Sequence, residues 1–285
     1  MDYDYISVSR DDGVVLLTMD MPEKLNPWTI PMMEEFTIEL DLIASNPDDK
    51  ALVITGAGTS FSGGGDVKAM AGEKPIRPHF MREHGPNKDR GIWNVPTLSA
   101  EERMNPVRLT GERIHKQIFN MNKPTIAAVN GVAAGAGCDL AFSCDFRIAA
   151  EGARFIQVYV RRGLIPLDGG LFWTPFHLPP GKAMEMLLLG EPLSAEEALH
   201  FGVVREVVPV EEVVPKSIEL AKRLASGPAI AIQIIKQIAR DLHMQGFEKS
   251  WDLVAKAQPS IWESHDVDEG VQSFLEKRPP EFTGT

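Results

Sequence analysis

Short apolar segments that alternate with segments of helical periodicity constrain the fold of this 285-residue chain most strongly. Their side chains are mostly β-branched or aliphatic, and they lack the polar–apolar alternation of a half-exposed strand. They comprise residues 13–19, 51–55, 125–129 and 145–149. Strands that are apolar on both faces and are separated by helices are typical of a parallel sheet covered by helices. The sequence therefore predicts an α/β fold.

The periodic pattern divides the chain into two regions and one irregular insertion. Helices are predicted over residues 31–44, 107–120 and 135–143, and a capping box at 194–197 precedes a last strand at 203–208. We predict a core over residues 1–205 and a helical region over 206–285, whose helices are interrupted by Pro215, Pro228 and Pro259. Residues 72–106 are rich in proline and aperiodic, which indicates an insertion near a pocket.

Charge and cysteine content limit the partners and the compartment. The net charge of −11 argues against non-specific binding to nucleic acid, although a few local cations would suffice for an anionic ligand. Cys138 and Cys144 fall on one predicted helix about 9 Å apart, beyond the reach of about 7 Å for a disulfide. Free thiols, an acidic N-terminus without signal-peptide features and no membrane-spanning apolar run together predict a cytoplasmic protein with no membrane partner.

Two glycine-rich turns, at residues 61–66 and 131–138, each follow an apolar strand and precede a helix. Neither has the spacing of a dinucleotide-binding or phosphate-binding loop, so each, taken alone, is no more than a tight turn that glycine permits. Together they allow two backbone N–H groups to point at one oxygen atom. Each donor of such an oxyanion hole is worth about 3–4 kcal/mol of transition-state stabilisation.

Several segments, in the order in which they occur, resemble the crotonase (enoyl-CoA hydratase/isomerase) superfamily along nearly the whole chain. They are residues 21–26, 61–67, 122–131, 135–141, 163–166 and 269–278. The resemblance implies an α/β spiral of ββα units followed by a C-terminal helical trimerisation region. It also implies a homotrimer or a dimer of trimers.

The same resemblance implies where an acyl-CoA thioester is held. It places the amides of an oxyanion hole at Gly63 and Ala136. Coenzyme A enters as part of the substrate, and no permanently bound cofactor or metal is expected. The CoA-binding positions implied by the family are Lys24, Leu25, Gly65, Asp66 and Val67, with Phe274 and Lys277 meeting the CoA of a neighbouring subunit.

The acid and base positions depart from the hydratases of the family, which carry two glutamates. Asp139 occupies the first of these positions, and Tyr159 the second. With its ordinary pKa near 10, Tyr159 is a poor base, and it is either a proton donor or a pocket wall. Asp168 is a further candidate, either as a catalytic carboxylate or as a turn aspartate bonded to nearby backbone.

These residues predict an enzyme that stabilises a thioester enolate while Asp139, with Asp168, moves protons at Cα and beyond. The outcome is hydration of an enoyl-CoA or a shift of its double bond, and the loss of the second glutamate favours the shift. Two alternatives remain open. One is a C–C bond hydrolase of a cyclic β-diketone, because oxocamphor hydrolase places an aspartate at the Asp168 register. The other is a CoA-binding protein without catalytic activity.

Overall fold

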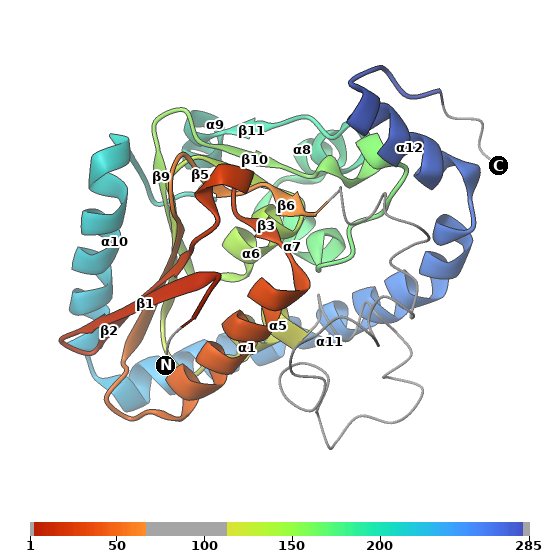
Figure 1. Cartoon of the computed structure of the whole chain (residues 1–285). Helices are drawn as coiled ribbons and strands as arrows, with labels where there is room; N and C mark the ends of the chain where they lie inside the picture. Colours follow the sequence, from red (N-terminus) through yellow and green to blue (C-terminus); the bar gives the residue numbers. More distant parts are fainter. Residues whose placement is uncertain (1–2, 67–112, 282–285) are drawn as a thin grey trace.

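A computed structural model describes residues 3–66 and 113–281 of the chain, and within these ranges its main sheet contains six strands (Figure 1). Their order is β1-β2-β4-β7-β9-β12. The pair β1–β2 is antiparallel, and all other neighbours are parallel, as predicted. The strands are Ile6–Asp11 (β1), Val14–Met19 (β2), Ala51–Gly56 (β4), Thr125–Val129 (β7), Phe146–Ala150 (β9) and Glu206–Val208 (β12).

A second sheet of short strands has the order β11-β10-β8-β5. The chain passes from one sheet to the other three times, from β4 to β5, from β7 to β8 and from β9 to β10, and the last two passages lead into helices α6 and α7. This arrangement confirms the predicted spiral of ββα units. The short strands are Ser60–Ser62 (β5), Val132–Ala134 (β8), Arg154–Ile156 (β10) and Leu193–Ser194 (β11), and Pro27–Trp28 (β3) pairs with Gly64–Gly65 (β6) in a third sheet.

The helices cover these sheets and enclose the core (Figure 1). Helix α10 packs across β2, β4, β7 and β9, while α1 contacts α5, and α11 contacts α5 and α7. The capping box predicted at Ser194 is present, with Glu197 as its partner. The helices are Ile30–Ser45 (α1), Arg113–Asn120 (α5), Ala136–Ser143 (α6), Gly170–His177 (α7), Pro180–Met184 (α8), Ala195–His200 (α9), Val210–Ala225 (α10), Ala229–Trp262 (α11) and His265–Glu276 (α12), with single turns at Pro22–Lys24 (η1), Val158–Arg162 (η4) and Glu185–Leu189 (η5).

Two of the three predicted proline breaks in the C-terminal region are wrong. Pro228 does separate α10 from α11, but Pro215 lies inside α10 and Pro259 inside α11. An interior proline costs a helix about 3 kcal/mol. In α10 this cost is offset because Val213, Ser217 and Ala221, one turn apart on one face, are buried against the sheet.

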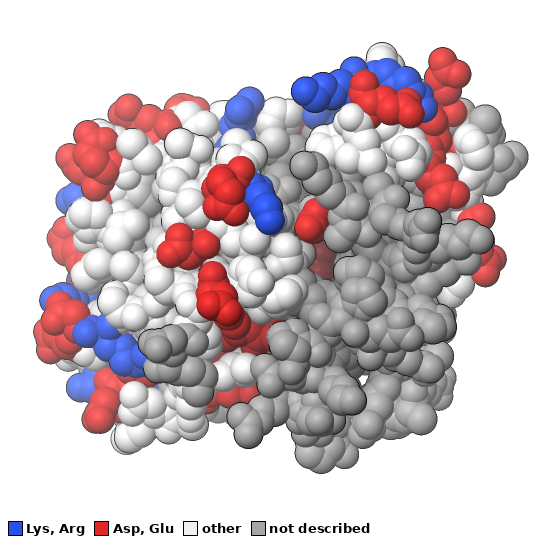
Figure 2. All heavy atoms as spheres, viewed as in Figure 1, with Lys and Arg blue, Asp and Glu red and all other residues white. Residues whose placement is uncertain are grey.

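The remaining local predictions concern thiols, surface charge and the insertion. Cys138 and Cys144 are buried free thiols, as predicted. Figure 2 shows acidic side chains spread over one face of the molecule, with basic side chains lying among them. In the described residues, none of the helices has the length and apolar character needed to cross a membrane. Residues 72–106 and Val67 lie outside the described residues.

Candidate active site

The structure brings the three predicted catalytic residues together around one phenol oxygen. The Tyr159 hydroxyl lies 2.7 Å from Asp168 Oδ2 and 3.0 Å from Asp139 Oδ2. Asp139 belongs to the first turn of α6, Tyr159 to η4, and Asp168 to the loop before α7. Three elements that are separate in the sequence therefore supply a carboxyl–phenol–carboxyl chain.

The proton count of this chain follows from its geometry. The hydroxyl group of Tyr159 has one hydrogen atom and can donate it to only one of the two carboxyl groups. For both contacts to be hydrogen bonds, the other carboxyl group must carry a proton and donate it to the phenol oxygen. At least one of the two carboxyl groups is therefore protonated when both bonds are made, so Asp139, Tyr159 and Asp168 together hold at most one negative charge.

Burial shifts the pKa of all three groups in the direction that this proton count requires. The pKa of Asp139 is raised to about 8, chiefly by burial and then by the negative charge of Asp168, against hydrogen bonds from Gln157 and Tyr159 that lower it. Burial also raises the pKa of Asp168, against the opposing influence of His115. The pKa of Tyr159 is raised well above its ordinary value, so the phenol keeps its proton. Because the charge of Asp168 adds to the effect of burial at Asp139, Asp139 is the carboxyl group whose protonated form is favoured.

The two carboxyl groups differ in access. Asp139 has an exposed fraction of 0%, whereas Asp168 is only partly buried. Tyr159 lies between them with an exposed fraction of 7%. Asp168 is therefore the more accessible of the two aspartates.

Gln157, which is itself bonded to Thr174, holds Asp139 in place, and the sequence analysis missed both residues. Gln157 Nε2 donates to Asp139 Oδ1 over 2.7 Å and lies 2.9 Å from Thr174 Oγ1, and both side chains are buried. Gly170 makes the close approach possible, because a Cβ atom at this position would lie 2.7 Å from Asp139 Oδ1. Single polar residues of this kind carry no recognisable spacing, so the sequence offered no signal for them.

The two glycine-rich turns pack directly on each other beside the carboxyl–phenol–carboxyl chain. A Cβ atom added at Gly64 would lie 2.5 Å from the Ala134 carbonyl oxygen and 3.6 Å from Gly135 Cα. On the other side of Gly135, an added Cβ atom would lie 3.6 Å from Tyr159 Cζ. Gly135 has a φ of +51°, a conformation that residues with a Cβ atom rarely adopt. The turn that precedes Ala136 therefore packs on the other turn and lies beside the phenol ring, close enough that one added carbon atom would touch the ring.

The N–H of Gly63, which was predicted as an oxyanion-hole donor, has an acceptor inside the fold. The Gly63 N–H donates to the Leu25 carbonyl oxygen over 2.7 Å, so this amide is already used within the fold. Leu25 and Asn26 both have a positive φ, which brings this carbonyl group to Gly63. The side chain of Asn26 fixes the bend by bonding Met21 N and the carbonyl oxygen of Ser60.

The neighbouring ladder identifies a different amide in the same turn. Pro27 faces Gly64 in the parallel pair β3–β6 and has no N–H, and the N–H of Gly64 donates to the Ser62 hydroxyl over 3.2 Å. At the next pair Trp28 faces Gly65. Because Pro27 cannot donate a hydrogen bond to β6, the N–H that β3 donates to β6 is that of Trp28, and this register leaves the N–H of Gly65 pointing away from β3. Ala136 is the first residue of α6, and its N–H has no acceptor inside that helix.

The predicted CoA-binding residues fall in two places. Lys24 and Leu25 end η1 with exposed side chains, and through the Leu25 carbonyl they contact the turn that carries Gly65 and Asp66. Phe274 and Lys277 are exposed at the end of α12. The guanidinium of Arg162 lies 4.3 Å from the centre of the Phe274 ring, which ties this end of α12 to η4. The described parts of the chain contain no group of three or more His, Cys, Asp or Glu that could hold a metal ion.

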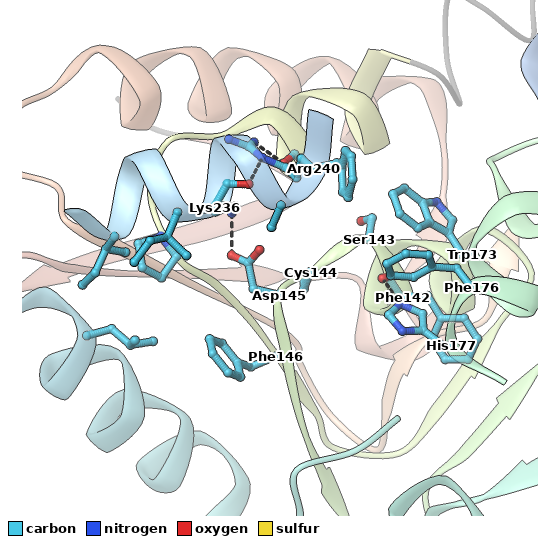
Figure 3. Close-up of a pocket in the computed structure, with 16 residues that line it drawn as sticks. Phe142, Ser143, Cys144, Asp145, Phe146, Trp173, Phe176, His177, Lys236 and Arg240 are labelled. Atoms are coloured by element: carbon cyan, nitrogen blue, oxygen red, sulfur yellow. Dashed lines mark hydrogen bonds and ion pairs between the residues drawn. The ribbon is translucent and has the colours of Figure 1, made fainter. Parts of the chain in front are cut away.

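A separate apolar cavity of about 380 Å³ lies at the other end of α6 (Figure 3). Phe142, Trp173 and His177 form one wall, and burial lowers the pKa of His177 to about 3, so its ring is neutral. Lys236 of α11 pairs with Asp145 at the opposite wall. None of the predicted site residues lines this cavity, so it is distinct from the carboxyl–phenol–carboxyl chain.

Comparison with known proteins gives one consistent result. The family model for enoyl-CoA hydratase/isomerase matches residues 9–99 and 97–285. The chain is 34% identical over 281 residues to a 1,2-epoxyphenylacetyl-CoA isomerase of Escherichia coli, and 30% identical over 283 residues to a crotonyl-CoA hydratase of Syntrophomonas wolfei, covering 99% of each chain in both cases. A crystal structure of a carnitinyl-CoA hydratase from Mycobacterium avium is similar with a TM-score of 0.80 at 31% identity, covering 99% of both chains.

Proposed function

Because the chain belongs to the enoyl-CoA hydratase/isomerase family, we propose that it converts an enoyl-CoA thioester by way of an enolate. The observation that carries this proposal is the close approach of the Gly135 turn to Tyr159, which leaves room for no more than one added carbon atom. This approach places the N–H of Ala136, at the N-terminus of α6, near the carboxyl groups of Asp139 and Asp168, which both contact the Tyr159 hydroxyl. An anion-stabilising donor and a proton-transfer group thus lie next to each other, which is what enolate formation requires.

The oxyanion hole in this proposal consists of the N–H groups of Gly65 and Ala136. Each follows directly after the residues at which the two turns touch, Gly64 on one side and Gly135 on the other. The dipole of α6 adds to the Ala136 donor, since a helix N-terminus favours negative charge. Gly63 serves instead to hold this turn in place through its bond to Leu25.

Asp168 is the base in this proposal, because it is the partly exposed member of the two carboxyl groups. It removes a proton from C2 of the acyl group, and the electron pair of that C–H bond becomes the enolate whose oxygen lies in the oxyanion hole. Return of a proton at C4 shifts the double bond from position 3 to position 2. Asp139 has no exposed surface and acts behind Asp168.

Coenzyme A binds, in this proposal, along the surface formed by Lys24, Leu25, Gly65 and Asp66, with Val67 beyond the described residues. Support comes from the exposure of Lys24 and Leu25 beside the turn that carries Gly65. The exposed Phe274 and Lys277 at the end of α12 are proposed to meet the CoA of a neighbouring copy. The coenzyme arrives with the substrate, as part of the thioester.

We further propose that α11 packs against other copies of this chain in a trimer or a dimer of trimers. Ile230, Ile234 and Ile238 follow one another at one-turn intervals, with exposed fractions of 75%, 48% and 57%. An apolar stripe of this kind on a helix is typical of a protein interface. Sedimentation equilibrium of Ile234→Asp tests the assembly: we expect smaller species than in the unmodified protein, and an unchanged mass contradicts this interface.

The experiment that tests the proposed function uses deuterium oxide and three substrates. Incubation with a 3-enoyl-CoA is expected to give the 2-enoyl-CoA, and deuterium is expected at C2 of recovered substrate. Crotonyl-CoA tests hydration, for which the same oxyanion hole and carboxyl groups would serve. Cleavage of a free cyclic β-diketone without any reaction of the thioesters would contradict the proposal in favour of a C–C bond hydrolase. Binding of thioesters without deuterium uptake would indicate a CoA-binding protein without activity.

A further inference from the structure

Tyr159 lies between two carboxyl groups that differ in solvent exposure. This position indicates a role beyond lining a pocket or donating a single proton. Its hydroxyl lies within hydrogen-bonding distance of both Asp139 and Asp168. Of the two aspartates only Asp168 has exposed surface, whereas Asp139 is fully buried and accepts a hydrogen bond from Gln157. A proton on Asp139 therefore has one route to a bound molecule through these contacts, which is the phenol oxygen.

We propose that Tyr159 is a proton relay, so that Asp168 removes the proton at C2 while Asp139, acting through Tyr159, supplies a different proton at C4. This inference rests on the proposed function and adds to it the separation of base and acid. It narrows the substrate class to β,γ-unsaturated acyl thioesters, whose isomerisation needs a proton removed at one carbon and another added two carbons away.

The cycle balances in protons and charge. In the resting state Asp168 is ionised, Tyr159 donates to it, and protonated Asp139 donates to the phenol oxygen. Asp168 takes the C2 proton, and the negative charge moves to the thioester oxygen. Tyr159 then gives its proton to C4, the Asp139 proton moves to the phenol oxygen, and the double bond forms between C2 and C3.

The relay also resets the site after the product leaves. At that point Asp168 is protonated and Asp139 is ionised. The Asp168 proton moves to the phenol oxygen while the phenol proton moves to Asp139, which restores the resting state without the need for a further proton from water. The burial of Asp139 and the raised pKa of Tyr159 favour this concerted shift over a free phenolate.

Two reactions of the enzyme distinguish the role of Tyr159 and Asp139 as a relay from the role of Asp168 as the base. Exchange of the C2 proton of a saturated acyl-CoA in deuterium oxide needs only Asp168, whereas isomerisation of a 3-enoyl-CoA also needs the relay. We expect Tyr159→Phe and Asp139→Asn to lower isomerisation at least about 100-fold, as for loss of a general acid, and to leave exchange within a few-fold of the unmodified enzyme. Asp168→Asn should abolish both reactions.

One matched control variant and two contrary outcomes test the relay. Tyr3→Phe removes another phenol bonded to a carboxylate, that of Glu39 over 2.7 Å, and should leave both reactions unchanged. If Tyr159→Phe lowers exchange and isomerisation equally, the phenol only positions the site, and the relay is wrong. If neither reaction changes, Tyr159 is a wall, and the relay is again wrong.

A measurement without substrate keeps the relay testable apart from the proposed function. The infrared carbonyl band of a protonated carboxyl group should be present at neutral pH in the full-length protein. It should disappear in Asp139→Asn and persist in Asp168→Asn. Absence of this band from the unmodified protein would overturn the relay even if the enzyme isomerises thioesters. Conversely, an enzyme that shows the band but reacts with no thioester would contradict only the proposed function.

Discussion

Gly137 of α6 packs directly on Ser62 of β5, so closely that an added Cβ atom would lie 2.6 Å from Ser62 Cβ. The contact joins the two glycine-rich turns one residue after Ala136 and three residues before Gly65. Ser62 is itself fixed, because its hydroxyl donates to the Asn26 carbonyl oxygen over 2.7 Å. The distance between the two proposed oxyanion-hole donors therefore depends on glycine at position 137.

Substitution Gly137→Ala should separate the two turns and destabilise the fold. Overpacking of a close contact costs about 1–3 kcal/mol, and urea denaturation with thioester turnover measured in parallel should show losses in both. Gly181→Ala is the matched control, because Gly181 also lies in a helix but has no atom within 4 Å of an added Cβ. That variant should be as stable as the unmodified protein or more so, by up to about 1 kcal/mol. Equal stability of the two variants would contradict the role of this contact.

Asp139 should make the free energy of unfolding fall as pH rises. Its pKa is raised from 3.8 to about 8 in the folded protein, chiefly by burial. Between these values the unfolded chain releases the proton and the folded chain keeps it, so unfolding is favoured by on the order of 1.4 kcal/mol for each pH unit in the window. Below the window both states are protonated, and above it both are ionised.

Asp139→Asn removes this dependence, and thermal unfolding measured from pH 4 to pH 9 checks it. We expect the variant to gain stability over the unmodified protein as pH rises, and the difference to level off above about pH 8. A residual slope from Asp168, whose pKa is also raised, should persist in both proteins. Parallel curves would show that Asp139 is ionised in the folded state.

How much the sequence predicted depends on the length of each feature. Strands such as Ala51–Gly56 were predicted because a run of apolar residues buried on both faces is visible without a structure. Strands of two or three residues, such as Gly64–Gly65, have too few positions to show a period. Pro215 was misread as a helix end because a local rule cannot include the packing of Val213 and Ala221 on the sheet.

The residues of the candidate site were likewise predicted only in part. The resemblance to a family pointed to Asp139, Tyr159 and Asp168, and the structure brings them together. Gln157 was missed because its role depends only on its distance from Asp139. The sequence offers no means of choosing an amide within Gly63–Gly65, because three adjacent glycines look alike in a sequence. The bond from Gly63 to Leu25, together with the register of β3 against β6, distinguishes them.

Ala136→Pro tests one oxyanion-hole donor with little change to the helix. Proline is accepted at the first position of a helix, so the substitution removes an N–H that α6 does not use. Loss of one such donor lowers turnover by about 100- to 1,000-fold, while binding of CoA thioesters should change much less. His265→Pro, at the first position of α12, is the matched control and should keep turnover. Unchanged turnover in Ala136→Pro would remove this amide from the mechanism.

A crystal structure of the protein with a bound CoA thioester that cannot react tests the central claim most directly. The thioester oxygen should lie about 2.7–3.1 Å from the backbone nitrogens of Gly65 and Ala136. The nearest carboxyl group to C2 should be that of Asp168, with the Gly63 N–H still bonded to Leu25. A thioester oxygen bound away from these two amides, or a C2 atom out of reach of Asp168, would contradict enolate formation at this site.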